Sequence, residues 1–154
     1  MANKIIAVIG YGIQGRAQSL NLRNSGFNVI IGNISDEKYN VAKSDGFEVM
    51  SISEAVELAD VIFLLIPDQA HKQVYQEHIL PKLTDGCTMV FAHGYSIHYK
   101  EIVPKVAVNI VLLAPRMPGE PIRDYYKKGG GVPAFVDVYQ DYTGEAWDIV
   151  LSLP

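Results

Sequence analysis

The chain alternates short apolar runs with segments of mixed polarity. The run at residues 61–66 contains no polar position, which is typical of a central parallel strand covered on both faces. The mixed segments carry apolar residues at helical spacing, such as Ile13, Ala17 and Leu20. This alternation predicts an α/β fold: a Rossmann-like, doubly wound, mostly parallel sheet with helices on both faces.

The predicted elements follow one another closely and fit one domain over residues 1–154. Strands are expected at residues 5–9, 28–31, 47–50, 61–66, 88–91, 109–113 and 134–139. Helices are expected at residues 13–25, 36–44, 53–58 (capped by Ser53), 69–79 and 144–153. Residues 114–121 are expected to form a stiff loop, because they contain Pro115, Pro118 and Pro121, and residues 127–131 are expected to form a flexible turn.

Composition narrows the class of protein. Hydrophobic residues make up 49% and charged residues 19% of the chain, which predicts a globular protein. The net charge of -4, with no basic run longer than Lys127–Lys128, argues against a nucleic-acid surface. No apolar run approaches the ~18 residues of a membrane span, and no signal peptide is expected. The single cysteine, Cys87, is expected to be a buried thiol, which fits a cytoplasmic protein.

A glycine motif follows the first strand and opens the first helix. In dinucleotide-binding folds the first glycine allows a tight turn, the second lets the backbone approach the pyrophosphate, and the third lets helix and strand pack closely. The helix N-terminus also presents free N–H groups to the phosphates. A purely structural turn is the alternative. The residues expected to bind the dinucleotide here are Gly10, Tyr11, Gly12, Ile13, Gln14 and Gly15.

The residues after the second strand, including Asn33, Ser35 and Asp36, are expected to meet the adenosine ribose. A carboxylate there accepts hydrogen bonds from ribose hydroxyls and repels a 2′-phosphate, whereas arginine favours that phosphate. This loop contains Asp36 and Glu37 and no arginine, which favours NADH over NADPH. Alternatively, Ser35 is a helix N-cap and the two carboxylates complement the helix dipole, and both interpretations can hold together.

Polar residues also follow two central strands, at the edge where parallel sheets bind ligands. After residues 61–66 the candidates for cofactor contact are Pro67, Asp68, Gln69 and His71, although Asp68 is equally well explained as a helix N-cap. His93 ends the strand at 88–91 beside a glycine that leaves room for a ligand. It is therefore the histidine best placed for chemistry, with a structural imidazole as the alternative.

The remaining histidines and the basic residues carry weaker signals. His71 and His78 lie within a predicted helix and are expected at the surface, and His98 is expected only to pack. Arg116 and Arg123 are the strongest cations near the carboxyl edge of the sheet.

The last predicted helix is apolar on nearly every side, with Asp148 and Ser152 as its polar residues after residue 145. Such a helix needs burial on more than one side. We therefore expect another domain or another subunit to cover part of it.

Five segments together resemble the N-terminal domain of ketol-acid reductoisomerase, also called acetohydroxy-acid isomeroreductase. The resemblance covers essentially the whole chain. Its most specific part is Ala-His-Gly-Tyr-Ser-Ile-His at residues 92–98, because generic dinucleotide folds lack this segment. The five segments are residues 8–15, 45–49, 65–68, 91–98 and 114–119.

The resemblance implies a pathway and a reaction. The family makes branched-chain amino-acid precursors by a magnesium-dependent alkyl migration on 2-acetolactate or 2-aceto-2-hydroxybutyrate, and then reduces the product with NADPH or NADH. Residues 11–14 match its phosphate-binding turn, residues 68–71 match a second cofactor stretch, and Gly119 matches a cofactor-contacting glycine. His93 matches the active-site histidine. Arg116 replaces a family lysine near substrate; it keeps the charge but cannot readily lose a proton.

Two further departures limit what the chain is expected to do. The loop after the second strand lacks the family's arginine and serine pattern for a 2′-phosphate. The family's Mg²⁺ ligands lie in a helical C-terminal domain that would begin after about residue 154, so we expect no metal site and no catalysis by this chain alone.

The expected partners follow from this resemblance. They are a nicotinamide dinucleotide and either that C-terminal domain or another subunit, in a homo-oligomer, without nucleic acid or membrane. A small stand-alone NAD(P)-dependent carbonyl reductase and a non-catalytic dinucleotide sensor are the alternative functions.

Overall fold

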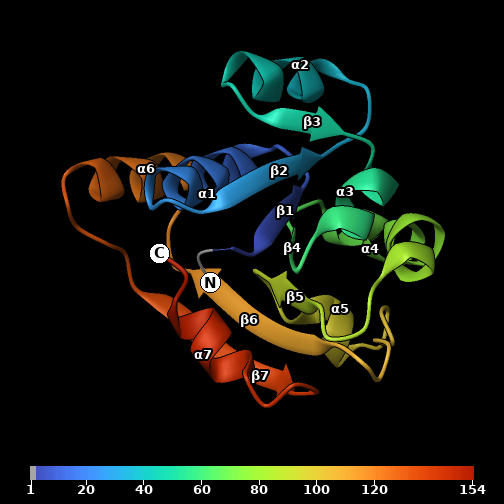
Figure 1. The fold of residues 1–154 in the computed structure, drawn as a ribbon. Coiled ribbons are helices and arrows are strands. Elements are labelled where there is room, and N and C mark those ends of the chain that lie inside the picture. The colour runs from blue at the N-terminus through green and yellow to red at the C-terminus, as the bar shows by residue number, and fades with distance from the viewer. Residues whose placement is uncertain (1–2) are drawn as a thin grey trace.

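Seven strands form one sheet in the computed structural model, which describes residues 3–154 (Figure 1). The strand order is β3-β2-β1-β4-β5-β6-β7, and every neighbouring pair is parallel except β6 and β7. The strands are β1 (Ile5–Ile9), β2 (Asn28–Gly32), β3 (Glu48–Met50), β4 (Val61–Leu64), β5 (Thr88–Phe91), β6 (Asn109–Pro115) and β7 (Ala134–Gln140).

Helices cover both faces of this sheet, as the sequence predicts. On one face α3 and the α4–η1 segment pack over residues such as Ile9 and Ile62, and on the other α1, α2 and α7 pack over residues such as Val8 and Phe63. Figure 1 shows α6 beside α1. The helices are α1 (Ile13–Asn24), α2 (Glu37–Ser44), α3 (Ile52–Leu58), α4 (Asp68–Val74), the π-helical η1 (Tyr75–Ile79), the 3₁₀ turn η2 (Leu80–Lys82), α5 (Tyr95–His98), α6 (Gly119–Lys127) and α7 (Ala146–Leu151).

The order of the strands places the candidate site. The chain runs outward from β1 to β2 and β3, returns to β4 on the other side of β1, and continues outward to β5 and β6. The order in which the strands are added therefore reverses between β1 and β4. In doubly wound folds, ligands bind at the carboxyl ends of the strands beside such a reversal. The glycine motif follows β1 at this position.

The apolar segments have the burial that their composition predicts. All four residues of β4 are buried, and the strand ends at Leu64 rather than at residue 66. Cys87 is also buried, and burial raises the pKa of its thiol to about 12. No helix within residues 3–154 is long and apolar enough to cross a membrane.

Two helices, α5 and α6, and the direction of β7 were not predicted from the sequence. Residues 119–127 form α6, although the prolines there suggested only a stiff loop. Pro118 is the N-cap of α6 and Pro121 lies in its first turn, where proline costs no intrahelical hydrogen bond. β7 pairs antiparallel with β6, with a bulge between Ile110 and Val111. The sequence pattern of β7 predicted that a strand forms there, but it did not predict the direction of that strand.

The predicted N-caps of α2 and α3 were wrong by one and two residues. The N-cap of α2 is Asp36, not Ser35, and its side chain accepts the N–H of Tyr39. The N-cap of α3 is Ser51, not Ser53. Ser51 and Glu54 form a capping box in which each side chain accepts the backbone N–H of the other residue.

Replacing Ser51 with alanine is expected to lower the free energy of unfolding by about 1 kcal/mol, because the capping hydrogen bond to Glu54 is lost. The matched control is Ser53→Ala, since Ser53 is not the cap and its hydroxyl contacts the exposed His78 ring. Urea denaturation of both variants measures the difference. Equal destabilisation of the two variants would contradict the assignment of the cap.

Candidate dinucleotide site

Two glycines of the motif are required by the packing of the protein itself. Gly10 has φ +95°, and a Cβ there would lie 2.8 Å from the Leu65 carbonyl oxygen. A Cβ on Gly15 would overlap the Gly10 carbonyl oxygen, so α1 can approach the end of β1 only if residue 15 lacks a side chain. These are the tight-turn and close-packing roles expected for the first and third glycines.

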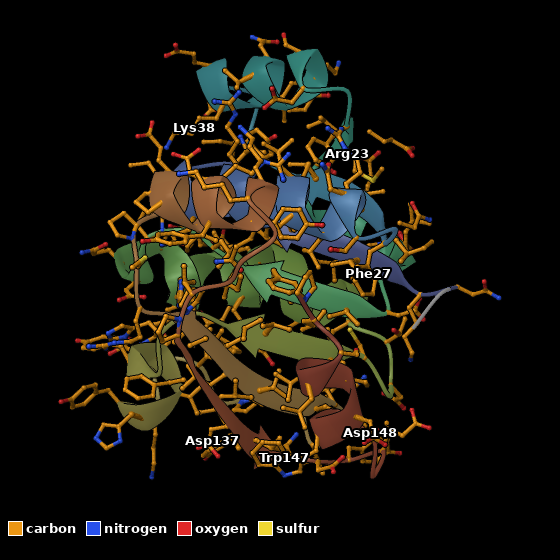
Figure 2. All side chains as sticks on the ribbon, turned by 90° about the vertical axis from the view of Figure 1, so that its left-hand side faces the viewer. Arg23, Phe27, Lys38, Asp137, Trp147 and Asp148 are labelled. Atoms are coloured by element: carbon orange, nitrogen blue, oxygen red, sulfur yellow. The ribbon has the colours of Figure 1, made fainter. Side chains whose placement is uncertain are left out.

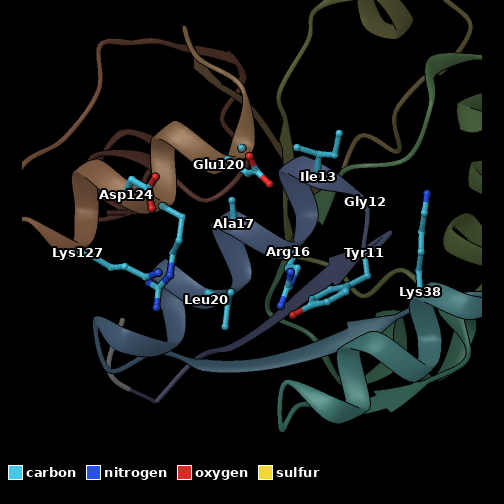
Figure 3. Close-up of a pocket in the computed structure, with 12 residues that line it drawn as sticks. Tyr11, Gly12, Ile13, Arg16, Ala17, Leu20, Lys38, Glu120, Asp124 and Lys127 are labelled. Carbon is cyan, nitrogen blue, oxygen red and sulfur yellow. The ribbon is translucent and has the colours of Figure 1, made fainter.

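Gly12 is different, because nothing in the protein requires a glycine at this position. It is the N-cap of α1, with an ordinary extended φ of -77°. A Cβ there would meet only Lys38 Nζ, at 3.9 Å. Figure 3 shows the side chain of Lys38 rising from α2 beside Gly12. The space over the second glycine is therefore open on the side where a ligand would approach the start of α1.

A side-chain network holds the turn in place. The Tyr11 hydroxyl donates to Asp45 Oδ2 at 2.8 Å, and Arg16 donates to both carboxylate oxygens of Asp45, at 2.7 and 3.0 Å. Arg16 holds the pKa of Asp45 below its usual range, and burial raises the pKa of Tyr11. Tyr11 also packs edge-on against Phe47, with ring centroids 5.8 Å apart. The turn is thereby tied to the loop before β3.

This network was not predicted from the sequence. In the sequence, Asp45 is indicated only as part of the family segment at residues 45–49, and no pattern indicates Arg16. The signal available in the sequence was a tyrosine inside the glycine motif, which needs a partner for its hydroxyl once it is buried.

The loop after β2 is joined to the turn by Asn33. Its Oδ1 accepts the N–H of Tyr11 at 3.3 Å, and its Nδ2 donates to Asp36 Oδ1 at 2.8 Å. Asp36 Oδ1 also accepts the N–H of Tyr39 at 3.0 Å. The Asn33 and Tyr39 donors both use Oδ1 of Asp36, and Oδ2 accepts no hydrogen bond from residues 3–154. Ser35 is exposed beside it.

The stretch after β4 lies as expected at the carboxyl edge, with two corrections. Pro67, not Asp68, is the N-cap of α4, and Asp68 is the first helical residue. His71 is buried rather than on the surface, and its ring contacts Ser96 and the Ile66 carbonyl oxygen. Gln69 is exposed.

His93 follows β5 and is exposed. Its Nδ1 accepts the N–H of Tyr95 at 3.2 Å, and Asp68 Oδ2 lies 3.9 Å from the same nitrogen. The two edge segments after β4 and β5 therefore meet at His93. His78 and His98 are both exposed, and the His98 ring packs edge-on against Tyr99 with centroids 4.7 Å apart.

The remaining site residues connect α6 to the turn. Gln14 donates to the Met117 carbonyl oxygen at 3.0 Å. A Cβ on Gly119 would overlap the Ile13 carbonyl oxygen, so this glycine lets the start of α6 pack directly on the start of α1. Arg116, between β6 and α6, places its guanidinium 4.8 Å from the centre of the Phe135 ring.

A groove of about 730 Å³ runs along the outer side of α1, between α6 and Lys38 (Figure 3). It shares Tyr11, Gly12 and Ile13 with the turn, but neither His71 nor His93 lines it. The groove therefore lies beside the glycine turn and does not include the edge of the sheet near His93.

The described residues do not supply a metal centre. Among residues 3–154, no group of three or more histidine, cysteine or acidic side chains is arranged to hold a metal ion.

Fold and turn together define a Rossmann-type α/β domain. The family model described as "Acetohydroxy acid isomeroreductase, NADPH-binding domain" matches residues 1–154. The chain therefore belongs to the acetohydroxy acid isomeroreductase family.

Named relatives agree with this assignment. Ketol-acid reductoisomerase (NADP(+)) of Pyrococcus abyssi is 49% identical over 99% of the chain, and that of Methanocaldococcus jannaschii is 51% identical over 98%. In each case the chain covers 46% of the relative, so it spans about half their length. An NADH-preferring ketol-acid reductoisomerase from an uncultured archaeon has a TM-score of 0.97 at 41% identity, over 98% of this chain and 47% of that one.

Replacing Asp45 with asparagine is expected to lower the free energy of unfolding at pH 7 by about 1 kcal/mol, because the charged hydrogen bonds to Arg16 are weakened. The native pKa of Asp45 is lowered, so this stabilisation is complete above the unfolded pKa of about 4 and is lost as pH falls through the native value. Urea titrations at several pH values should show the two proteins converging in acid. A constant difference would mean that charge is not involved. Asp124→Asn, at an exposed position on α6, is the control.

Proposed function

We propose that this chain binds a nicotinamide dinucleotide across the carboxyl ends of β2, β1 and β4, with its pyrophosphate over Gly12. The observation that carries the proposal is the open space at Gly12, where neither the backbone conformation nor packing explains a glycine. A pyrophosphate lying against the backbone explains it. The adenosine ribose then meets Asn33 and Asp36, and the nicotinamide extends toward Asp68 and His93.

The whole protein is proposed to be a ketol-acid reductoisomerase, in which this chain is the cofactor half. The family resemblance and the names of the relatives support the assignment. The bound nicotinamide would supply the hydride for reduction of a carbonyl. His93 would contact the substrate at the edge of the sheet, and Arg116 would offer a fixed positive charge. The described residues do not fit a Mg²⁺ site, so no step through a metal is assigned to them.

The proposed cofactor preference is for NADH. Asp36 Oδ2 is available to a ribose hydroxyl, and a carboxylate there would repel a 2′-phosphate. An NADH-preferring protein of nearly the same fold supports this preference, whereas the family description and the curated relatives name NADPH or NADP(+). Lys38 is the nearby cation that could oppose the preference.

The exposed apolar side chains support a covering partner, which we propose to be the other half of the longer relatives or a second subunit of a homo-oligomer in the cytoplasm. On α7, Ala146, Ile149 and Val150 are buried against the sheet, whereas Trp147 and Leu151 are 47% and 67% exposed. Figure 2 shows Trp147 on the outer side of α7. A helix with both sides apolar is stable only when both are covered.

Replacing Gly12 with alanine is expected to lower the affinity for NADH by at least about tenfold without unfolding the protein, because the methyl group meets no protein atom closer than Lys38 Nζ but occupies the space of the pyrophosphate. Gly12→Val should abolish binding. Gly131→Ala is the matched control, since a Cβ there also lies in open space. Calorimetric titration measures the affinities. Unchanged binding by Gly12→Ala and Gly12→Val would overturn the assignment of the turn.

Replacing Asp36 with asparagine is expected to raise the ratio of NADPH to NADH affinity by about tenfold or more, because it removes the charge that repels a 2′-phosphate while Oδ1 can still cap α2. Asp36→Arg should raise the ratio further but also lose the cap. Glu37→Gln, at the exposed neighbouring position, is the control. Titration of each variant with both cofactors is the measurement, and a ratio that follows Glu37 instead would assign the discrimination to that residue.

A further inference from the structure

One buried imidazole joins the two edge segments of the site. His71 lies on α4 and is 3% exposed. Its Nδ1 lies 2.7 Å from Ser96 Oγ, and its Nε2 lies 3.0 Å from the Ile66 carbonyl oxygen. Ile66 follows β4, and Ser96 lies on α5, three residues after His93. The ring therefore connects the carboxyl end of β4 to the segment that carries His93.

The partners of His71 determine where its proton lies. A carbonyl oxygen can only accept, so Nε2 carries the proton and donates to Ile66, and Nδ1 accepts from the Ser96 hydroxyl. Burial lowers the pKa of His71, which favours this neutral form. Ser96 is itself buried, so its hydroxyl depends on the ring for a partner. Both ring nitrogens are used inside the protein, which leaves no polar atom of the ring for a cofactor.

Asp68 couples the same two segments electrostatically. Its Oδ1 lies 3.7 Å from His71 Nε2, and its Oδ2 lies 3.9 Å from His93 Nδ1. Asp68 and His93 are the titratable groups that face His71, and the third neighbour is the Phe91 ring, with centroids 6.2 Å apart. The position of α5 against α4 thus determines how His93 stands relative to Asp68.

We propose that His71 is a positioning residue, which as a neutral imidazole with its proton on Nε2 locks α5 to the end of β4 and so fixes His93 at the nicotinamide end of the site. The link that His71 makes between α5 and the end of β4, called the lock below, follows from the contacts of His71. Its effect on the nicotinamide rests on the proposed function. Direct contact between His71 and the cofactor, as the family resemblance implies, is the competing interpretation.

The tautomer of His71 is tested first, by long-range ¹H–¹⁵N NMR of the histidine rings in the 154-residue chain. We expect the His71 signals of an Nε2–H ring, and protonation only at a pH below about 6.5, where an unperturbed histidine titrates. The exposed His98 provides the comparison within the same spectra. An Nδ1–H ring, or ordinary titration of His71, would overturn the proposal.

A double-mutant cycle then tests whether the bond between His71 and Ser96 carries the effect. His71→Leu and Ser96→Ala are each expected to lower the affinity for NADH by about tenfold, the size of one net hydrogen bond, and together to lower it no further. His71→Gln should restore affinity, because its amide can donate to Ile66 and accept from Ser96. Full affinity in Ser96→Ala with a loss in His71→Leu, or a product of the two losses in the double variant, would assign His71 to the cofactor instead.

The NMR signals of the His93 ring test the contact between α5 and the end of β4 without any ligand. They should shift in His71→Leu and in Ser96→Ala, and return toward the wild-type positions in His71→Gln. If His71→Leu does not fold, Ser96→Ala still removes the bond by deleting a single hydroxyl. A wild-type chain that binds neither NADH nor NADPH contradicts the proposed function alone, whereas unchanged His93 signals in Ser96→Ala contradict the lock.

Discussion

The contact between the start of α1 and the end of β1 is the constraint on which the site depends. A side chain at residue 15 would overlap the Gly10 carbonyl oxygen, so the helix stands against the strand only with glycine at both ends of the turn. This close approach aims the free N–H groups of α1 across the edge of the sheet. The Tyr11–Asp45–Arg16 network and Asn33 then fix the turn from the side, so that the backbone needs little further ordering when a ligand arrives.

The fold could be predicted from the sequence because local and global signals agree. Apolar runs predicted the strands, and the glycine motif predicted the turn between β1 and α1. The errors arose where two signals compete. Proline marks both loops and the first turns of helices, so α6 was missed. Two serines two residues apart offer similar caps, and only the geometry of Glu54 selects Ser51. The antiparallel direction of β7 depends on how the chain returns from α6, which no residue of the strand encodes.

The candidate site was predicted in part for the same reason. Residues at the ends of strands, such as Asp68 and His93, lie where a parallel topology must place them. Their contacts are not local, however, and no pattern in the sequence predicts which residues of the two segments meet. His71 was expected at a helix surface because its neighbours in α4 are polar, but the ring faces Ser96, which is 25 residues away along the chain. A histidine in an amphipathic helix is ambiguous until the element packed against it is known.

The packing of α6 on α1 has a consequence for how the domain is made. Gln14 and Met117 are separated by 103 positions, yet they share a hydrogen bond, and Gly119 rests on the carbonyl of Ile13. During synthesis the glycine turn leaves the ribosome about 100 residues before α6, the helix that packs against it. A nascent chain halted before residue 117 would therefore carry the glycine motif without its support.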